Sequence, residues 1–330
     1  MNEEFEKYIL HDCDTGADDA IAVMMLLSHS HRVKAVALTC VGGNTKLNDV
    51  VMNNLRLLKL YNMLDKVPVY KGCGGPILPV IPVAQVCHIH GSDGMGDVPS
   101  MEPAASDDLL QNLQEEHAVN AIIRISKEYN GKLSIIATGP LTNLAMAVRL
   151  DPELPSRLKE IFIMGGTRLG KGNTTPAAEF NFHFDPEGAH MTLSSYAKKC
   201  AVHLIDYEVT LDYAVSWPWF HHWLSDNKNK KTKFAKAILE TLRAYCEVKE
   251  TKEWERGMSL CDAYAMAILL NSAVGLEPKQ LGVAVELSGF FSRGSLVVDH
   301  FNRKNNFSPV TFYEGIDLDL YKKLLIDTFL

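Results

Sequence analysis

The chain has 330 residues, of which 47% are hydrophobic and 22% are charged, and its formal net charge is −7. This composition is ordinary for a globular protein and supplies ample apolar material for a large core. Because the chain is acidic and has no basic tract, we do not expect it to bind nucleic acid or an anionic membrane surface, although a small neutral ligand remains possible. No linker is evident, so we expect one domain over residues 1–330.

Cysteine usage and the first residues predict a cytoplasmic protein. The seven cysteines are scattered, odd in number and never spaced as Cys-x-x-Cys, which is typical of reduced thiols rather than of disulfides or a zinc site. Residues 1–7 are acidic and lack the basic start and apolar run of a signal peptide. No apolar stretch approaches the roughly 20 residues of a membrane span.

Short apolar runs alternate with amphipathic stretches along the chain. Strands are predicted at 8–10, 33–41, 67–70, 133–137, 160–164 and 201–205. Helices are predicted at 19–27, 47–60, 118–129 and 141–150. Residues 283–287 and 295–298 predict an added β-hairpin.

This β-α-β-α rhythm predicts an α/β fold: a Rossmann-like, mostly parallel sheet with helices on both faces, plus the small hairpin. Ligands of such folds lie at the carboxyl ends of the strands. Glycine-rich turns follow several of the predicted strands here, and glycine lets the backbone approach a ligand closely. The segment 72–108 is too long for a plain connection and predicts an active-site flap.

An acidic run follows the first predicted strand and leads into a helix. Asp12, Asp14, Asp18 and Asp19 lie within eight residues, and without neutralisation they would repel one another in a partly buried site. Oxygen ligands with no His or Cys pair nearby favour a hard cation, Ca²⁺ or Mg²⁺. Helix capping by Asp18 and Asp19 is the simpler interpretation, but it leaves the other two aspartates unexplained.

Three enzyme families share parts of this run. Asp14-Thr15-Gly16 is similar to the aspartic protease triplet, but those enzymes need two copies and this chain has one. Asp-x-Asp after a strand is similar to the aspartyl-phosphate phosphatases, in which the first Asp, here Asp12, is the nucleophile. Their pattern lacks the paired aspartates. The full string from Asp12 to Ala20 resembles the opening signature of the nucleoside hydrolases.

The resemblance to nucleoside hydrolases continues to about residue 270. Further segments similar to the family's motifs are 88–96, 137–145, 163–166, 178–182, 185–187 and 261–262. Each motif is weak alone, but their shared order is highly specific. The resemblance implies hydrolysis of ribonucleosides to free base and ribose, with Ca²⁺ as cofactor and a homodimer or homotetramer as the assembly.

The resemblance also implies a role for each matching residue. The implied metal ligands are Asp14, Asp19, the backbone carbonyl of Thr138 and Asp262. The implied contacts to sugar and base are Asp18, Asn44, Met164, Asn173, Glu179, Phe180 and Asn181. Asp14 is also the implied general base, and His90 near the base is the second implied catalytic residue. Carboxylates around the sugar suit this reaction, because cleavage of an N-glycosidic bond passes through an oxocarbenium-like state.

One departure from the family pattern concerns Cys261, which stands where many members have a His thought to protonate the departing base. A thiol matches that task poorly near neutral pH, and a small buried role for Cys261 is the simpler interpretation. Activation of the leaving group could then come from His90, an aromatic stack or water. Two alternatives therefore stay open: a nucleoside-binding or weakly active homologue that keeps the calcium and ribose site, and a metal-dependent phosphatase.

Overall fold

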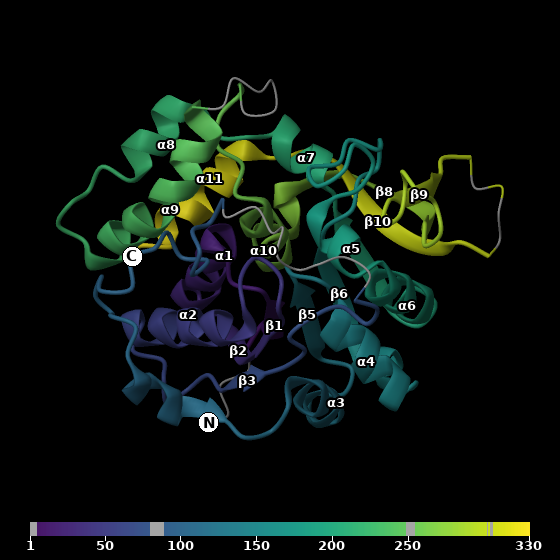
Figure 1. The fold of residues 1–330 in the computed structure, drawn as a ribbon, viewed down its shortest axis with the longest axis horizontal. Coiled ribbons are helices and arrows are strands. Elements are labelled where there is room, and N and C mark those ends of the chain that lie inside the picture. The colour runs from purple at the N-terminus through teal and green to yellow at the C-terminus, as the bar shows by residue number, and fades with distance from the viewer. Residues whose placement is uncertain (1–4, 80–88, 249–254, 302, 304–305) are drawn as a thin grey trace.

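In the part of the chain that the structure describes, ten strands form one sheet in the order β4-β3-β2-β1-β5-β6-β7-β10-β8-β9 (Figure 1). The structure is a computed structural model that describes residues 5–79, 89–248, 255–301, 303 and 306–330. Neighbouring strands from β4 to β10 are parallel, whereas β8 is antiparallel to both β10 and β9. The mostly parallel sheet and the added hairpin are confirmed.

The strands of the parallel part are short and apolar. They are β1 (Lys7–Cys13), β2 (Val33–Cys40), β3 (Val69–Lys71), β4 (Leu113–Gln114), β5 (Leu133–Ala137), β6 (Leu158–Met164), β7 (Ala201–Ile205) and β10 (Ser308–Ile316). β1 shows why the apolar run is continuous: Ile9 and Cys13 belong to the hydrophobic core on one face of the sheet, and Leu10 belongs to the core on the other.

Helices cover both faces, as predicted. One core contains side chains from α1 (Ala17–Ser28), α2 (Leu47–Leu60), α7 (Tyr207–Asp212), α8 (Trp217–Trp223), α9 (Lys230–Val248), α10 (Cys261–Leu270) and α11 (Leu318–Asp327). The other contains side chains from α3 (Ala118–Glu128), α4 (Thr142–Leu150), α5 (Phe180–Phe184) and α6 (Pro186–Tyr196). Short 3₁₀ turns are η2 (Asp107–Asn112), η3 (Leu154–Arg157) and η5 (Ser272–Val274).

Two helices at the centre of the first core are buried almost all round. Every residue of α10 is buried, and so is every residue of α1 except Ser28. They pack against each other, and alanines on both allow a close approach. Their first turns hold Asp18 and Asp19 on α1 and Asp262 on α10, so both amino ends meet near the end of β1.

The carboxyl-terminal part differs most from the prediction. β8 (Gly275–Val285) begins eight residues before the predicted start of its strand, and β9 spans Leu296–Asp299. Most of the first half of β8 is exposed, so its sequence lacks the apolar pattern on which the prediction depended. β10 and α11 were not predicted, although Val310 and Phe312 of β10 are buried in alternation with less buried residues, as in a half-buried strand.

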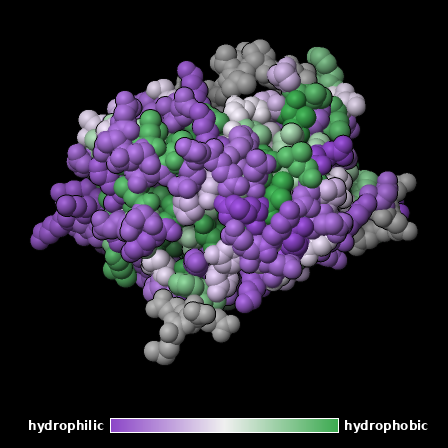
Figure 2. All heavy atoms as spheres, turned by 90° about the horizontal axis from the view of Figure 1, so that it is seen from below, coloured by the Kyte–Doolittle hydropathy of each residue, from purple (hydrophilic) through white to green (hydrophobic). Residues whose placement is uncertain are grey.

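Figure 2 shows a face dominated by hydrophilic residues, with hydrophobic residues in smaller groups among them. Within the described ranges, we find no helix with the length and hydropathy needed to cross a membrane. Between β8 and β9, Phe290 and Phe291 are 92% and 84% exposed. The homodimer or homotetramer expected from the resemblance stays a prediction.

The long segment after β3 is anchored by a buried arginine. Residues 80–88, which include Cys87 and His88 of the predicted flap, lie outside the described residues. The part of the segment after that gap contacts Arg56 of α2, which is only 1% exposed. Arg56 donates hydrogen bonds to the carbonyls of Val98, Met101 and Pro103 at 2.8, 3.2 and 2.8 Å. Its guanidinium also lies 5.2 Å from the ring centre of Phe234 on α9.

Replacing Arg56 should therefore destabilise the whole protein. Arg56→Met leaves three carbonyls without their donor, so we expect the free energy of unfolding to fall by about 2–4 kcal/mol. Urea denaturation followed by circular dichroism measures this change. Arg149→Met, on an exposed position of α4, is the matched control and should change the free energy by less than about 0.5 kcal/mol. Equal effects of the two substitutions would contradict the anchoring role.

Candidate active site and metal centre

One pocket gathers most of the residues implied by the resemblance at the carboxyl end of the parallel strands. Ten of them line it: Asp18, Asn44, His90, Thr138, Met164, Asn173, Glu179, Phe180, Asn181 and Asp262. Asn44, Thr138 and Met164 follow or end β2, β5 and β6, as expected for ligands of an α/β sheet. Asp14 and Asp19 are fully buried beside this wall and do not line the pocket themselves.

Asp14 lies where two glycine turns approach its carboxylate. Its Oδ2 accepts a hydrogen bond from the backbone N–H of Asn44 at 2.7 Å. A Cβ added at Gly43 would lie 2.1 Å from this Oδ2, and one added at Gly139 would lie 2.9 Å from Oδ1. Glycine at both positions is therefore required by the close approach of backbone to carboxylate.

Asp19 is held from several sides. Its Oδ2 accepts from the backbone N–H of Gly16 at 2.9 Å and from Nδ2 of Asn44 at 3.1 Å, and its Oδ1 accepts from the hydroxyl of Thr138 at 2.6 Å. Nε2 of His11 lies 2.9 Å from the same hydroxyl. Because that hydroxyl gives its proton to Asp19, His11 must be the donor to Thr138. His11 is fully buried and was missed by the sequence reasoning.

The carboxylates form one cluster. Asp18, Asp19 and Asp262 each offer an oxygen, and these three oxygens lie within 4.8 Å of one another. Burial, followed by the neighbouring charge of Asp18, raises the pKa of Asp19 to about 7. Burial and the neighbouring aspartates also raise the pKa of Asp14 and of Asp262 well above the ordinary range. The cluster therefore holds its negative charge poorly on its own.

These residues fit a metal ion. Oδ1 of Asp14 and Oδ1 of Asp18 are buried and accept no hydrogen bond from any residue that the structure describes. Among the described residues, no lysine or arginine pairs with Asp14, Asp18, Asp19 or Asp262, and the nearby Nδ1 of His90, 3.7 Å from Oδ1 of Asp18, belongs to a neutral ring. A cation at the cluster would supply the missing positive charge, and carboxylate oxygens are the ligands that hard cations prefer. The resemblance implies that Asp14 binds the metal and that Asp18 binds the sugar. The three oxygens that lie within 4.8 Å of one another differ from this set, because they include one from Asp18 and none from Asp14.

The opposite wall of the pocket is built by α5 and the end of β6. Glu179 caps α5 by accepting from the backbone N–H groups of Asn181 and Phe182, and it also accepts from Gly166 at 2.8 Å. Burial outweighs these hydrogen bonds and raises the pKa of Glu179 to about 7. Nδ2 of Asn181 donates to the carbonyls of Thr138 and Met164 at 2.8 and 3.2 Å. A carbonyl has a second lone pair, so Thr138 can still bind a cation.

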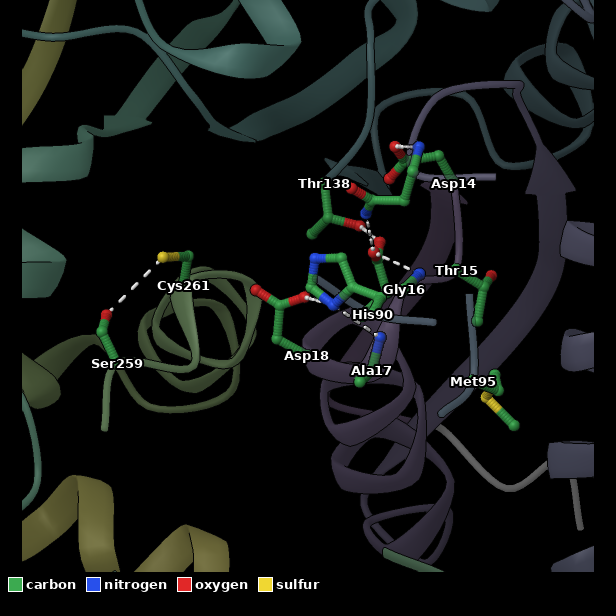
Figure 3. Close-up of polar contacts among 12 residues, drawn as sticks. Asp14, Thr15, Gly16, Ala17, Asp18, His90, Met95, Thr138, Ser259 and Cys261 are labelled. Carbon is green, nitrogen blue, oxygen red and sulfur yellow. Dashed lines mark hydrogen bonds and ion pairs between the residues drawn. The ribbon is translucent and has the colours of Figure 1, made fainter. Parts of the chain in front are cut away.

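His90 enters the site from the described end of the flap. Its Nδ1 accepts from the backbone N–H of Ala17 at 3.2 Å, so Nε2 carries the proton of the neutral ring. Burial lowers the pKa of His90 below the ordinary value, while Asp18 acts in the opposite direction. Figure 3 shows the ring beside Asp18, with its second nitrogen facing the space between Thr138 and Cys261.

Cys261 lines the pocket as a neutral thiol. Its Sγ lies 3.3 Å from the hydroxyl oxygen of Thr210 and 3.5 Å from that of Ser259 (Figure 3). Burial raises the pKa of this thiol to about 12. A thiol that holds its proton so firmly is a poor donor to a leaving group near neutral pH, in agreement with the simpler interpretation of Cys261 as a small buried residue.

Asp12 is a buried neighbour of the site that does not line the pocket. It accepts hydrogen bonds from Thr39 at 2.6 Å and from Asn143 at 2.8 Å, both at Oδ1. These contacts give Asp12 a structural role and lend no support to the nucleophile that the phosphatase alternative requires.

The structure adds seven residues to the pocket wall: Ile89, Thr174, Tyr207, Leu242, Tyr245, Ser259 and Cys261. Tyr245 of α9 brings an aromatic ring to this wall. Thr174 and Ile89 adjoin implied residues in sequence and could have been found that way. Leu242 follows the ordinary apolar spacing of α9, so its sequence gives no signal of a pocket role.

Comparison with known proteins agrees with this geometry. A family model described as inosine-uridine preferring nucleoside hydrolase matches residues 9–323. A relative of the same description from Leishmania major is 34% identical, covering 97% of this chain and 96% of its own. The pyrimidine-specific ribonucleoside hydrolase RihA from Escherichia coli O127:H6 is 30% identical, covering 97% of both chains.

A solved structure gives the same result. The inosine-guanosine nucleoside hydrolase IG-NH superposes with a TM-score of 0.86 at 28% identity, covering 98% of both chains. The sheet order, the acidic cluster at the strand ends and the sequence matches over nearly the full length therefore lead to one assignment. This chain belongs to the inosine-uridine preferring nucleoside hydrolase family.

Proposed function

We propose that this protein hydrolyses the N-glycosidic bond of ribonucleosides, in a calcium-dependent reaction that releases free base and ribose. The observation that carries the proposal is the group of buried carboxylates beside a pocket, with oxygens of Asp14 and Asp18 that accept no hydrogen bond from the described residues. Family membership supports the reaction, because the relatives described above are named as ribonucleoside hydrolases.

Calcium is the cation that best fits the proposed ligands Asp14, Asp19, Asp262 and the Thr138 carbonyl. All of these atoms are oxygens, which suits Ca²⁺ or Mg²⁺ rather than zinc. Calcium accepts a larger and less regular shell than magnesium, and can therefore include water and sugar hydroxyls. When bound, the ion supplies Lewis-acid chemistry, lowering the pKa of water and orienting the diol.

Side chains in and beside the pocket would carry out the other steps of the reaction. We propose that Asp14 accepts the proton of the attacking water, since its Oδ1 accepts no hydrogen bond from the described residues and a carboxylate beside the ion could take that proton. Asp18, Asn44, Glu179 and Asn181 would bind the ribose, and the carboxylates would stabilise positive charge on the sugar. Met164, Asn173 and Phe180 would complete the contacts to sugar and base.

His90 is proposed as the second catalytic residue. With Nδ1 occupied by the N–H of Ala17, the ring can offer Nε2–H to the substrate. Because its pKa is lowered, the ring is neutral at neutral pH, and it would assist the leaving group as a hydrogen-bond donor rather than as an imidazolium. The firmly protonated Cys261 leaves this assistance to His90, to an aromatic side chain such as Tyr245, or to water.

The first test is release of ribose from a panel of purine and pyrimidine nucleosides. We expect turnover that a chelator abolishes and that Ca²⁺ restores better than Mg²⁺. Asp14→Asn should lower kcat by about 10²–10⁴-fold, because the general base is lost. The control is Asp226→Asn on an exposed loop, which should leave kcat unchanged. Calcium-dependent nucleoside binding without ribose release would instead support the weakly active or binding-protein alternative.

The second test concerns the metal ligands directly. Asp262→Ala removes a carboxylate from the first turn of α10, so we expect the dissociation constant for Ca²⁺ to rise by at least about 100-fold. Isothermal titration calorimetry with Ca²⁺ alone measures this without any assay of turnover. Unchanged calcium affinity together with full activity in this variant would show that the metal assignment is wrong.

The third test uses pH. In the metal-free folded protein, the pKa values of Asp19 and Glu179 are raised to about 7, whereas carboxyl groups of the unfolded chain titrate near 4. The folded state then binds more protons between about pH 4 and 7, so these groups make the free energy of unfolding fall as pH rises through that window.

We therefore expect the chelated protein to lose about 3 °C or more of Tm between pH 5 and pH 8, measured by calorimetry. Added Ca²⁺ should restore most of this loss, and Asp19→Asn should flatten the profile of the chelated protein. A Tm that rises across the same range in the chelated protein, with no difference in Asp19→Asn, would contradict the role of these carboxylates.

A further inference from the structure

The loop between β6 and α5 brings Asn173 and Thr174 to the pocket. Both residues are exposed, yet they line the same pocket as Asp18 and Asp262 of the acidic cluster. Exposed loop residues position a substrate only if the backbone beneath them is fixed. Contacts that fix the first turn of this loop come from a residue outside the pocket.

Glu208, the second residue of α7, holds the first turn of this loop. Its side chain is almost fully buried, with the residue 3% exposed. Oε2 accepts the backbone N–H of Arg168 at 2.8 Å, and Oε1 accepts those of Leu169 and Lys171 at 2.9 and 3.1 Å. Gly170, within this turn, has a φ of +72°, which lets the three N–H groups converge on one carboxylate.

A second contact ties the same turn to the sheet. The guanidinium of Arg168 lies 3.2 Å from Oδ2 of Asp206 and 3.1 Å from a carboxylate oxygen of Glu314 on β10. Asp206 caps α7 by accepting the N–H of Val209 at 2.8 Å. Loop and helix are therefore joined at two points, through the Glu208 carboxylate and through Arg168.

The rest of the loop transmits this anchoring to the pocket. The N–H of Gly172 donates to the carbonyl of Pro176 at 3.1 Å, and the N–H of Thr174 donates to that of Ala178 at 3.3 Å. Oδ1 of Asn173 accepts the N–H of Phe180 at 2.9 Å, at the start of α5. Residues 168–171 lead directly into this hydrogen-bonded turn, so a change in their backbone is expected to disturb the position of Asn173.

We propose that Glu208 is a positioning residue, which fixes Asn173 and Thr174 against the bound nucleoside by holding the backbone of residues 168–171. The proposal rests on the function proposed above. Glu208 does not line the pocket, so it acts through the loop and not by touching the substrate. Its neighbour Tyr207 does line the pocket, so α7 sets two parts of the same wall.

The direct test is amide hydrogen exchange on the full-length protein. In Glu208→Gln, whose single carbonyl oxygen replaces two carboxylate oxygens, we expect faster exchange at Arg168, Leu169 and Lys171. The rate should rise by about tenfold or more, as expected when a hydrogen bond to a charged group is lost. Glu187→Gln is the matched control, because it removes a carboxylate that pairs with Arg293 instead. Unchanged exchange in Glu208→Gln would overturn the proposal.

The functional test separates positioning from a merely structural role. Glu208→Ala should raise KM by about tenfold while kcat changes by less than about threefold, and Glu208→Gln should lie between Glu208→Ala and wild type. If Glu208 acts through the loop side chains, Glu208→Ala combined with Asn173→Ala should resemble Asn173→Ala alone. Additive effects of the two substitutions on KM would overturn the proposal.

Failure of the proposed function gives a different pattern. If the wild-type protein releases no ribose, the same variants are compared by calorimetric titration with inosine and Ca²⁺, and the exchange measurement stands unchanged. Faster exchange with unaltered inosine affinity would contradict the positioning role of Glu208. Faster exchange with weakened affinity would support it, even if turnover is absent.

Discussion

The crowding of buried carboxylates at the amino ends of α1 and α10 is the constraint on which the site depends. Two like charges about 4–5 Å apart repel by roughly 3–4 kcal/mol at an effective dielectric of 20. Asp18, Asp19 and Asp262 form three such pairs, and Asp14 adds to them. A helix amino terminus stabilises a nearby negative charge by only about 0.3–2 kcal/mol, so two helices cannot balance the cluster.

The remaining balance must come from protons or from a cation. In the metal-free protein it comes from protons, which is why the pKa values of Asp14, Asp19 and Asp262 are raised. A bound cation would displace those protons and turn an unfavourable cluster into a binding site. The same four aspartates thus explain both the weak acidity of the metal-free site and its fitness for metal.

The floor and the walls of the site have different origins. The floor is built from β1, α1, β5 and α10, whose side chains also form the hydrophobic cores. Parts of the walls come from the flap residue His90 and from the loop that carries Asn173. The floor is therefore held by the packing of the core. The flap segment and the loop depend on separate contacts, such as the hydrogen bond from Arg56 to the carbonyl of Pro103 and the one from the N–H of Arg168 to Glu208.

The sequence predicted the floor better than the walls. The strand before Asp12 and the helix after it are set by local patterns, and the β-α-β rhythm places Asn44, Thr138 and Met164 at the same edge of the sheet. His11 and Glu208 could not be predicted, because their partners, Thr138 and residues 168–171, are remote in sequence or lie in an irregular loop. The place of β10 between β7 and β8 is likewise set by tertiary packing, although its own alternating pattern is local.

The burial of α10 has a consequence for how the protein is made. Asp19 lies near the start of the chain and Asp262 on a helix close to its end, and the two carboxylates meet only when α10 has packed against α1. During synthesis, the ribosome releases α1 long before α10 exists. The nascent chain therefore carries an incomplete ligand set for most of its synthesis, and full metal affinity arises only when nearly the last elements dock. Metal capture would then mark the completion of folding.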